Sequence, residues 1–159
     1  MKEQNLNIRY MVAQLSELSQ QEQELVNKAK AATNNAYANY SHFYVGAALL
    51  LGDGRIVIGA NQENAAYPSG LCAERTAMFA ASANNPGKAM LSLAIVGGFN
   101  GTLSDTPCSP CGACRQVMAE YQTSAGRPMS IIMYGTKKTW KFDKVDDILP
   151  FIFDSFNEK

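Results

Sequence analysis

Cys72-Ala73-Glu74-Arg75 and Pro110-Cys111-Gly112-Ala113-Cys114-Arg115 are the two stretches that organise this chain. Each is followed by a run of apolar residues at helical spacing, so each cysteine group is expected at the N-terminus of a helix. The free backbone N–H groups and the dipole of a helix N-terminus favour an anionic thiolate. Two such termini facing each other would offer the thiolates of Cys72, Cys111 and Cys114 to one metal ion and leave one tetrahedral corner open.

Glu74 would place a carboxylate beside that open corner. Catalytic zinc sites keep an open position for water, whereas structural sites fill it with a fourth ligand. Taken alone, Cys111-x-x-Cys114 is a weak signal, because redox dithiols share this spacing. Cys108 leaves an alternative open, since a fourth sulfur ligand would make the site structural. We favour a free or packed thiol at Cys108, because a closed site would leave Glu74 without a role.

The bulk properties are those of one globular domain of 159 residues, with 47% hydrophobic and 18% charged side chains. Lys+Arg and Asp+Glu both number 14, and this neutral balance is poor support for a nucleic-acid binder. The longest apolar stretch, residues 45–51, is too short to span a bilayer, and the N-terminus has no apolar leader. The four cysteines therefore indicate metal ligands or thiols, and a cytoplasmic location is expected.

The order of predicted elements indicates an α/β domain. Ser19 opens a helix, with Glu22 completing a capping box, and Asp53-Gly54 predicts a hairpin turn. This order gives a central sheet covered by helices on both faces. Residues 1–18 are expected to be an N-terminal extension, either an edge strand, a subunit contact or a loosely packed arm, and 19–159 the domain. Strands are predicted at 7–12, 45–51, 55–60, 91–97, 130–134 and 139–142, helices after the cysteine groups to about 84 and 122, and a helical turn at 145–149.

Four stretches together carry a family resemblance that runs from about Ala31 to Phe153. The stretches are Tyr40-Ser41-His42-Phe43-Tyr44-Val45-Gly46-Ala47-Ala48, Asn61-Gln62-Glu63-Asn64-Ala65-Ala66-Tyr67, Cys72-Ala73-Glu74-Arg75-Thr76-Ala77 and Pro110-Cys111-Gly112-Ala113-Cys114-Arg115-Gln116-Val117. With these stretches, the chain resembles the small, single-domain, all-cysteine type of cytidine deaminase, and its cysteine groups match the zinc-deaminase signature. The resemblance implies a three-layer α/β/α fold with a mixed central sheet of about five strands.

The resemblance also implies an activity, a cofactor and an assembly. The reaction is the hydrolytic deamination of cytidine and 2′-deoxycytidine to uridine and 2′-deoxyuridine, with release of ammonia, in pyrimidine salvage. One Zn²⁺ per subunit, held by Cys72, Cys111 and Cys114, activates water, and Glu74 transfers the protons. The implied partners are a small nucleoside and three further copies of the chain in a homotetramer, with no nucleic acid and no membrane.

The remaining site residues are likewise implied by matching positions. They are Asn61 and Glu63 on the ribose hydroxyls, Phe43 beside the base, Tyr67 in the pocket lining, the backbone at Ala73 on the pyrimidine edge, and Phe153 reaching a neighbouring subunit's site. Four of the site residues also have a plainer interpretation: Glu63 would be an exposed strand-end charge, Glu74 a solvated first-turn acid, and Phe43 and Phe153 core or interface residues.

Three thiolates on one Zn²⁺ leave a net negative charge that weakens the metal as a Lewis acid. We therefore hypothesise that Arg75 or Arg115 hydrogen-bonds a ligand sulfur, although both could be ordinary helix-surface arginines. His42, the only histidine, is expected to be a surface or loop residue.

Three other functions remain to be separated from cytidine deamination. One is a blasticidin-S deaminase, a related zinc enzyme, and another is a deaminase of polynucleotides or tRNA, which neutral charge and Cys72 argue against. The third is a non-catalytic structural zinc module, which a four-cysteine site with Cys108 would support.

Overall fold

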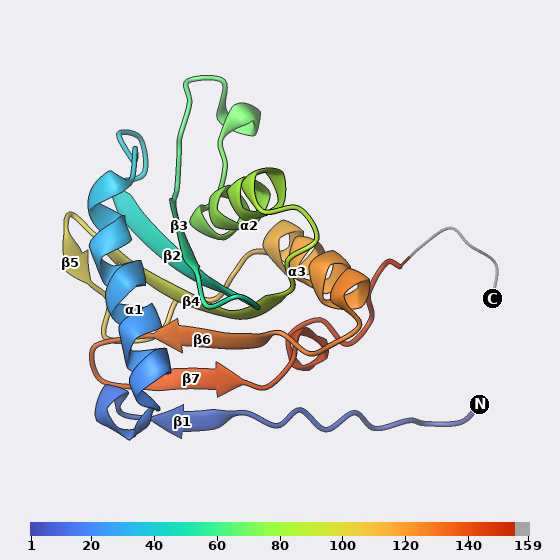
Figure 1. Cartoon of the computed structure of the whole chain (residues 1–159). Helices are drawn as coiled ribbons and strands as arrows, with labels where there is room; N and C mark the ends of the chain where they lie inside the picture. The colour runs from blue at the N-terminus through green and yellow to red at the C-terminus, as the bar shows by residue number, and fades with distance from the viewer. Residues whose placement is uncertain (155–159) are drawn as a thin grey trace.

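The computed structural model describes residues 1–154, which form three layers, with the sheet lying between two layers of helices (Figure 1). Residues 155–159 of the expected domain lie outside the described residues. Short 3-10 helices lie at Leu15–Glu17, Thr33–Asn35, Tyr67–Ser69 and Val145–Asp147. The longer elements are the helices α1 (Gln20–Ala32), α2 (Ala73–Asn84) and α3 (Gly112–Ala125), and the strands β1 (Met11–Ala13), β2 (Phe43–Leu51), β3 (Ile56–Ala60), β4 (Met90–Phe99), β5 (Thr102–Leu103), β6 (Ser130–Tyr134) and β7 (Thr139–Phe142).

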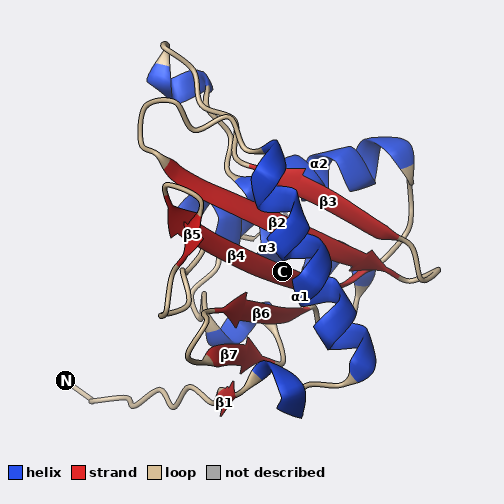
Figure 2. Cartoon of the chain, turned by 90° about the vertical axis from the view of Figure 1, so that its left-hand side faces the viewer, coloured by secondary structure: helices blue, strands red, loops and turns tan. Residues whose placement is uncertain are grey.

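The sheet is mixed, and its strands lie in the order β1-β7-β6-β4-β2-β3, with β5 paired to β4. The β4–β6 pair is parallel, and the other pairs are antiparallel. Helix α1 covers one face, and α2 and α3 cover the other (Figure 2). The predicted α/β/α fold is therefore confirmed. No helix within residues 1–154 has both the length and the apolar character needed to cross a bilayer.

The sheet is larger than predicted, with seven strands among the described residues instead of about five. The edge strand expected at 7–12 is present, but it begins later, at Met11, and pairs with β7. The loop expected after residue 97 contains β5, because Asn100 and Gly101 take left-handed conformations (φ 50° and 78°) that turn the chain back onto β4. Helix α3 also runs three residues beyond the expected end, to a left-handed C-cap at Gly126.

The sheet separates two hydrophobic clusters, one on each face. Along β4, Leu93 and Ile95 pack into the cluster under α2 and α3, while Ala94 and Val96 pack into the cluster under α1. Successive side chains of a strand point to opposite faces, so a strand covered on both sides is apolar throughout. This explains the continuous apolar runs in the sequence.

The first turn of α2, which follows Cys72, lies in close backbone contact with strand β3. A Cβ at Gly59 of β3 would collide with the backbone of Ala73 and Ala77 in α2. Glycine at this position therefore allows the first turn of α2 to lie directly against β3. Because Cys72 precedes that turn, the contact determines where the first cysteine lies.

The predicted capping box at the start of α1 is present and extends into an ion pair. Ser19 Oγ accepts a hydrogen bond from the Glu22 backbone, and the Ser19 backbone N–H donates to Glu22 Oε2. Glu22 Oε1 also lies 2.6 Å from Lys141 Nζ of β7, so this contact joins α1 to the sheet. Burial raises the pKa of Glu22, but hydrogen bonds from Lys141 and Ser19 outweigh this effect and hold it below the ordinary value of 4.5.

The substitution Glu22→Gln should lower the free energy of unfolding at pH 7 by about 0.5–1 kcal/mol, because glutamine keeps the cap but loses the charge facing Lys141. A lowered folded-state pKa stabilises the protein above the unfolded-state pKa, and this contribution is lost as the pH falls through the folded-state value. The difference between wild type and variant should therefore shrink below about pH 4.5. Urea unfolding at several pH values checks this, with Glu24→Gln on the exposed face of α1 as the control. An equal difference at pH 7 and pH 3 would contradict the expectation.

Candidate active site

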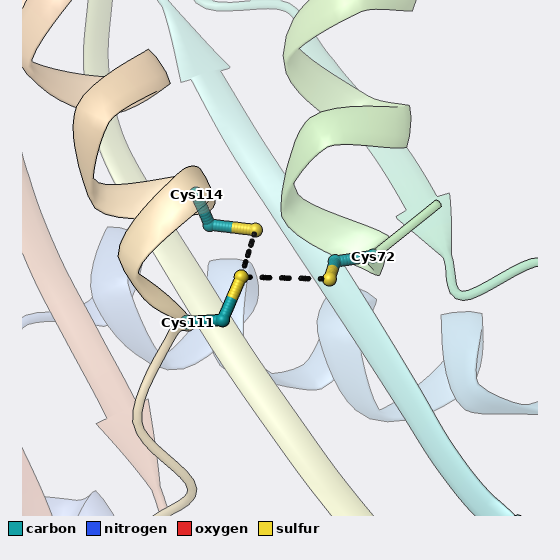
Figure 3. A group of neighbouring side chains, drawn as sticks. All are labelled: Cys72, Cys111 and Cys114. Atoms are coloured by element: carbon teal, nitrogen blue, oxygen red, sulfur yellow. Dashed lines mark hydrogen bonds between the residues drawn. The ribbon is translucent and has the colours of Figure 1, made fainter. Parts of the chain in front are cut away.

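Two helix N-termini meet on one side of the sheet, as predicted, and each begins at a cysteine. Cys72 is the N-cap of α2 and Cys111 is the N-cap of α3, and neither side chain caps its helix by a hydrogen bond. Cys114 lies one turn into α3 and is buried. Figure 3 shows the three side chains pointing toward one another from the two helices.

The sulfur atoms of these residues form the metal-binding candidate of the described chain. Cys72 Sγ and Cys111 Sγ lie 3.8 Å apart, and Cys111 Sγ and Cys114 Sγ lie 3.5 Å apart. All three lie within 4.8 Å of one another. Tetrahedral zinc with Zn–S bonds of about 2.3 Å separates its sulfur ligands by about 3.8 Å. The donor set and its spacing therefore fit a zinc ion, and the fourth corner receives no side chain from this cluster.

The surroundings of Cys72 favour its thiolate. Hydrogen bonding with the Cys114 thiol lowers the pKa of Cys72 to about 5, and a hydrogen bond from Arg75 adds to this effect. Arg75 Nη2 donates to Cys72 Sγ at 3.5 Å, so this arginine contacts a sulfur of the cluster. The thiolate is the form that binds a metal and is stabilised beside a helix N-terminus.

Arg115 makes different contacts. Its Nε donates to the carbonyl of Pro110 at 3.0 Å, and its Nη1 donates to the carbonyl of Ile148 at 3.0 Å. Through these two bonds, Arg115 connects Pro110, the residue before Cys111, to the C-terminal segment at Ile148. Of the two arginines in the hypothesis, the structure thus places Arg75 on a sulfur and Arg115 on backbone carbonyls.

Glu74 lies in the first turn of α2 and is buried, with 4% of its surface exposed. Burial raises the pKa of Glu74 to about 7, and the negative charge of Cys72 acts in the same direction. A carboxyl group with a pKa near the working pH can both accept and donate a proton. A solvated first-turn acid would not show this burial, so the plainer interpretation of Glu74 is wrong.

A cavity of about 530 Å³ opens beside the sulfur cluster and contains most of the predicted substrate contacts. Its lining includes Cys72, Glu74 and Cys111, so the metal candidate and the buried acid face the same space. The other predicted site residues that line it are Phe43, Asn61, Glu63, Tyr67, Ala73 and Arg75. These positions are far apart in the sequence and are brought together by β2, the end of β3 and the start of α2.

Phe153 does not line this cavity in the single chain. Its backbone is bonded on both sides to the Gln116 side chain of α3, as donor at 3.2 Å and as acceptor at 2.6 Å. The Phe153 residue is 65% exposed. Gln116 therefore bonds the tail to α3, and most of the Phe153 residue stays exposed.

Several lining residues were not singled out from the sequence. Ser41, Val45 and Ile95 belong to motif or strand stretches whose pattern gave no sign of which side chains face the cavity. Cys108 also lines the cavity, although it is absent from the sulfur cluster. Burial raises the pKa of the Cys108 thiol to about 12, with a further contribution from the charge of Glu74. Cys108 is thus a neutral wall residue, which supports the preferred interpretation.

His42 lies in an exposed turn between α1 and β2, as expected for a loop residue. Its backbone has a φ of 56°, and its carbonyl accepts a hydrogen bond from the Asn100 backbone. It belongs to the loop beside the cavity and is absent from the cavity lining.

A family model for the cytidine and deoxycytidylate deaminase zinc-binding region matches residues 19–126. The chain belongs to the cytidine and deoxycytidylate deaminase family. The cytidine deaminase of Halalkalibacterium halodurans is 48% identical over 100 residues, which cover 62% of this chain and 70% of that relative. The cytidine deaminase of Mycoplasma pneumoniae is 34% identical over 132 residues, covering 83% and 93%.

Solved structures of cytidine deaminases share the fold over most of the chain. The enzyme from Burkholderia pseudomallei is 40% identical, with a TM-score of 0.70, over 82% of this chain and 97% of that one. The enzyme from Mycobacterium tuberculosis is 36% identical, with a TM-score of 0.66, over 83% and 96%. With these relatives, the chain is a cytidine deaminase enzyme, a hydrolase, and its three-cysteine cluster lies in the zinc-binding region of the family.

Replacing Cys72, Cys111 or Cys114 by serine should lower zinc affinity more than about tenfold, because each change removes a sulfur ligand. Cys108→Ser is the matched control and should retain the ion, because its sulfur lies outside the cluster. Chelator competition followed by metal analysis measures the affinities. An equal loss in Cys108→Ser would indicate a site closed by four cysteines.

Proposed function

We propose that this deaminase converts cytidine and 2′-deoxycytidine to uridine and 2′-deoxyuridine with release of ammonia, as a step of pyrimidine salvage. The observation that carries the proposal is the buried Glu74 carboxyl in a cavity shared with two sulfurs of the metal candidate. We also propose one Zn²⁺ per subunit, held by Cys72, Cys111 and Cys114. Zinc bound there would supply a Lewis acid that lowers the pKa of a water molecule.

Glu74 is the proposed proton carrier of the reaction. It takes a proton from the attacking water, whose oxygen forms a bond to C4 of the cytosine ring. It delivers this proton to the ring N3, then takes the second proton from the new C4 hydroxyl and delivers it to the amino group, so that the C4–N bond breaks as C4=O forms and ammonia leaves. One carboxyl group can do both when it is held within reach of both partners and its pKa lies near the working pH. The raised pKa of Glu74, about 7, supports this role.

The far side of the cavity is proposed to hold the nucleoside. Hydrogen bonds from the Ser41 side chain and from the Tyr40 and Ser41 backbones hold the pKa of Glu63 below its ordinary value, so this side chain is ionised and can accept from a ribose hydroxyl. These backbone bonds use Glu63 Oε2. Asn61 is proposed as the second ribose contact, Phe43 as the ring beside the base, Tyr67 as a lining residue and the backbone at Ala73 as a contact to the pyrimidine edge.

The assembly proposed for the enzyme is a homotetramer. Phe151 is 86% exposed and Phe153 is 65% exposed, although the tail that carries them is fixed to α3 through Gln116. A fixed segment with large, exposed apolar residues suits a contact with a neighbouring subunit. Phe153 would then complete a neighbour's cavity. We also propose a cytoplasmic location, which is supported by four cysteines that form no disulfide in the described structure.

The non-catalytic alternative gains no support from the site. A structural zinc module needs a closed set of ligands, but Cys108 is absent from the sulfur cluster. Such a module would also have no use for a buried carboxyl group that lines an open cavity.

The substitution Glu74→Gln should reduce kcat for cytidine by about 10²–10⁴-fold, because the amide cannot carry protons. Zinc content and the folded state should be retained, because Glu74 is not a ligand of the sulfur cluster. The loss of cytidine absorbance measures turnover, and Glu120→Gln on the exposed face of α3 is the control. Full activity in Glu74→Gln would refute the proposed role.

Purified enzyme should turn over cytidine and 2′-deoxycytidine but neither blasticidin S nor cytidines within RNA. Among the described residues, the cavity lining has Arg75 as its one cation; Arg75 is already engaged with Cys72, so these residues offer no free cation for an RNA phosphate backbone. Ammonia release from each substrate at equal concentration gives the comparison. Faster release from blasticidin S than from cytidine would favour the blasticidin-S deaminase, and release from RNA alone would favour a polynucleotide enzyme.

A further inference from the structure

The carboxamide of Asn61 makes hydrogen bonds to strand β2, beyond the point where β3 ends. The β2–β3 ladder finishes at the pair Gly46 and Ala60. One residue later, the Asn61 backbone N–H donates to the Val45 carbonyl at 3.2 Å. The Asn61 side chain then accepts from the Val45 backbone N–H at 2.8 Å and donates to the Phe43 carbonyl at 2.9 Å. The side-chain amide thus takes the place of the next peptide group of a neighbouring strand.

These bonds satisfy the side of β2 that β3 no longer covers. On its other side, β2 pairs with β4 through the register Phe43–Phe99, Tyr44–Gly98 and Val45–Gly97. A backbone N–H or carbonyl without a partner at a partly buried strand end costs free energy and loosens the segment. Asn61 therefore completes the pairing of the part of β2 that faces the cavity.

The loop before Phe43 is held from the same short segment. Glu63 Oε2 accepts from the backbone N–H groups of Tyr40 and Ser41 at 2.8 Å and 3.2 Å. Ser41 Oγ in turn accepts from the Phe43 backbone N–H at 3.0 Å. The chain on both sides of Phe43 is thus bonded to residues that immediately follow β3.

The Phe43 ring occupies a narrow place that leaves little room for displacement. A Cβ at Gly97 would come within 3.0 Å of the ring and within 2.9 Å of Cys108 Sγ, so both side chains pack over this glycine. The ring also contacts Phe99, with centroids 4.6 Å apart. A shift of the Phe43 backbone would therefore change the wall of the cavity.

We infer that Asn61 is a positioning residue for Phe43, in addition to any contact with the ribose. Its carboxamide holds the Phe43–Val45 backbone so that the ring keeps its place in the cavity wall. This inference rests on the proposed function and deepens it, because it gives Asn61 an effect on the base that does not need a ribose hydroxyl. Both halves of the amide are required, since an aspartate could accept from Val45 but could not donate to Phe43.

Amide hydrogen exchange of the intact, substrate-free enzyme tests the bonds directly. In Asn61→Ala and Asn61→Asp, exchange of the amides of residues 43–45 should become about tenfold faster or more, as the segment loosens. Asn64→Ala is the matched control, because the Asn64 side chain bonds only the nearby Ala66 backbone and is absent from the cavity lining. Unchanged exchange in both Asn61 variants would overturn the inference.

A substrate without ribose hydroxyls separates positioning from ribose contact. With 2′,3′-dideoxycytidine, Asn61→Ala should still lose about tenfold or more in kcat/KM relative to wild type, with zinc content unchanged. In a Phe43→Leu background, the same substitution should cost less than about twofold, because the residue through which it acts is gone. Equal kcat/KM for wild type and Asn61→Ala on this substrate would reduce Asn61 to a ribose contact and overturn the inference.

The two tests also distinguish this inference from the proposed function. Wild-type enzyme that fails to release ammonia from cytidine would refute the proposed function and any kinetic role of Asn61. In that case the exchange measurement would still decide whether the carboxamide holds the Phe43–Val45 segment. Normal turnover with unchanged exchange would leave the function standing and remove the positioning role.

Discussion

The meeting of two helix N-termini is the constraint on which the rest of this structure depends. It brings Cys72 and Cys111, each an N-cap, together with Cys114, so that three sulfurs lie within 4.8 Å of one another. Thiolates so close to one another repel, and the helix dipoles and Arg75 offset part of that repulsion. The same first turn of α2 buries Glu74. The metal-binding candidate and the proposed proton carrier are therefore placed by one local arrangement.

The sheet holds this arrangement through close contacts that leave little room for larger side chains or for displacement of the backbone. Gly59 lets the first turn of α2 approach β3, and Asn61 continues the pairing of β2 where β3 stops. The end of β3 thus positions residues on both sides of the cavity. It positions Cys72 through α2 and Phe43 through β2. A rigid sheet carrying short, bonded segments at its ends is a common way to fix reacting groups. Residues at this strand end therefore both complete the sheet and position the side chains that line the cavity.

Local signals in the sequence predicted much of this, and non-local contacts account for what they missed. Apolar runs and turn residues located β6 and β7 at their observed bounds, and the cysteines at helix starts were correctly placed. Strand β5 was missed, because it has only two residues and follows β4 directly through a left-handed turn. So short a strand leaves no periodic pattern in the sequence. The bonds of Asn61 were also missed, since they depend on segments that meet only after folding. The place of Phe153 in an assembly stays a prediction.

We propose that three sulfurs hold a zinc ion while its fourth position stays open to a small molecule. X-ray absorption at the zinc edge of the purified enzyme tests this most directly, because it counts the sulfur atoms around the ion. We expect three sulfurs at about 2.3 Å and one lighter oxygen or nitrogen neighbour. Four sulfurs at that distance, with no lighter neighbour, would contradict it and make the site structural.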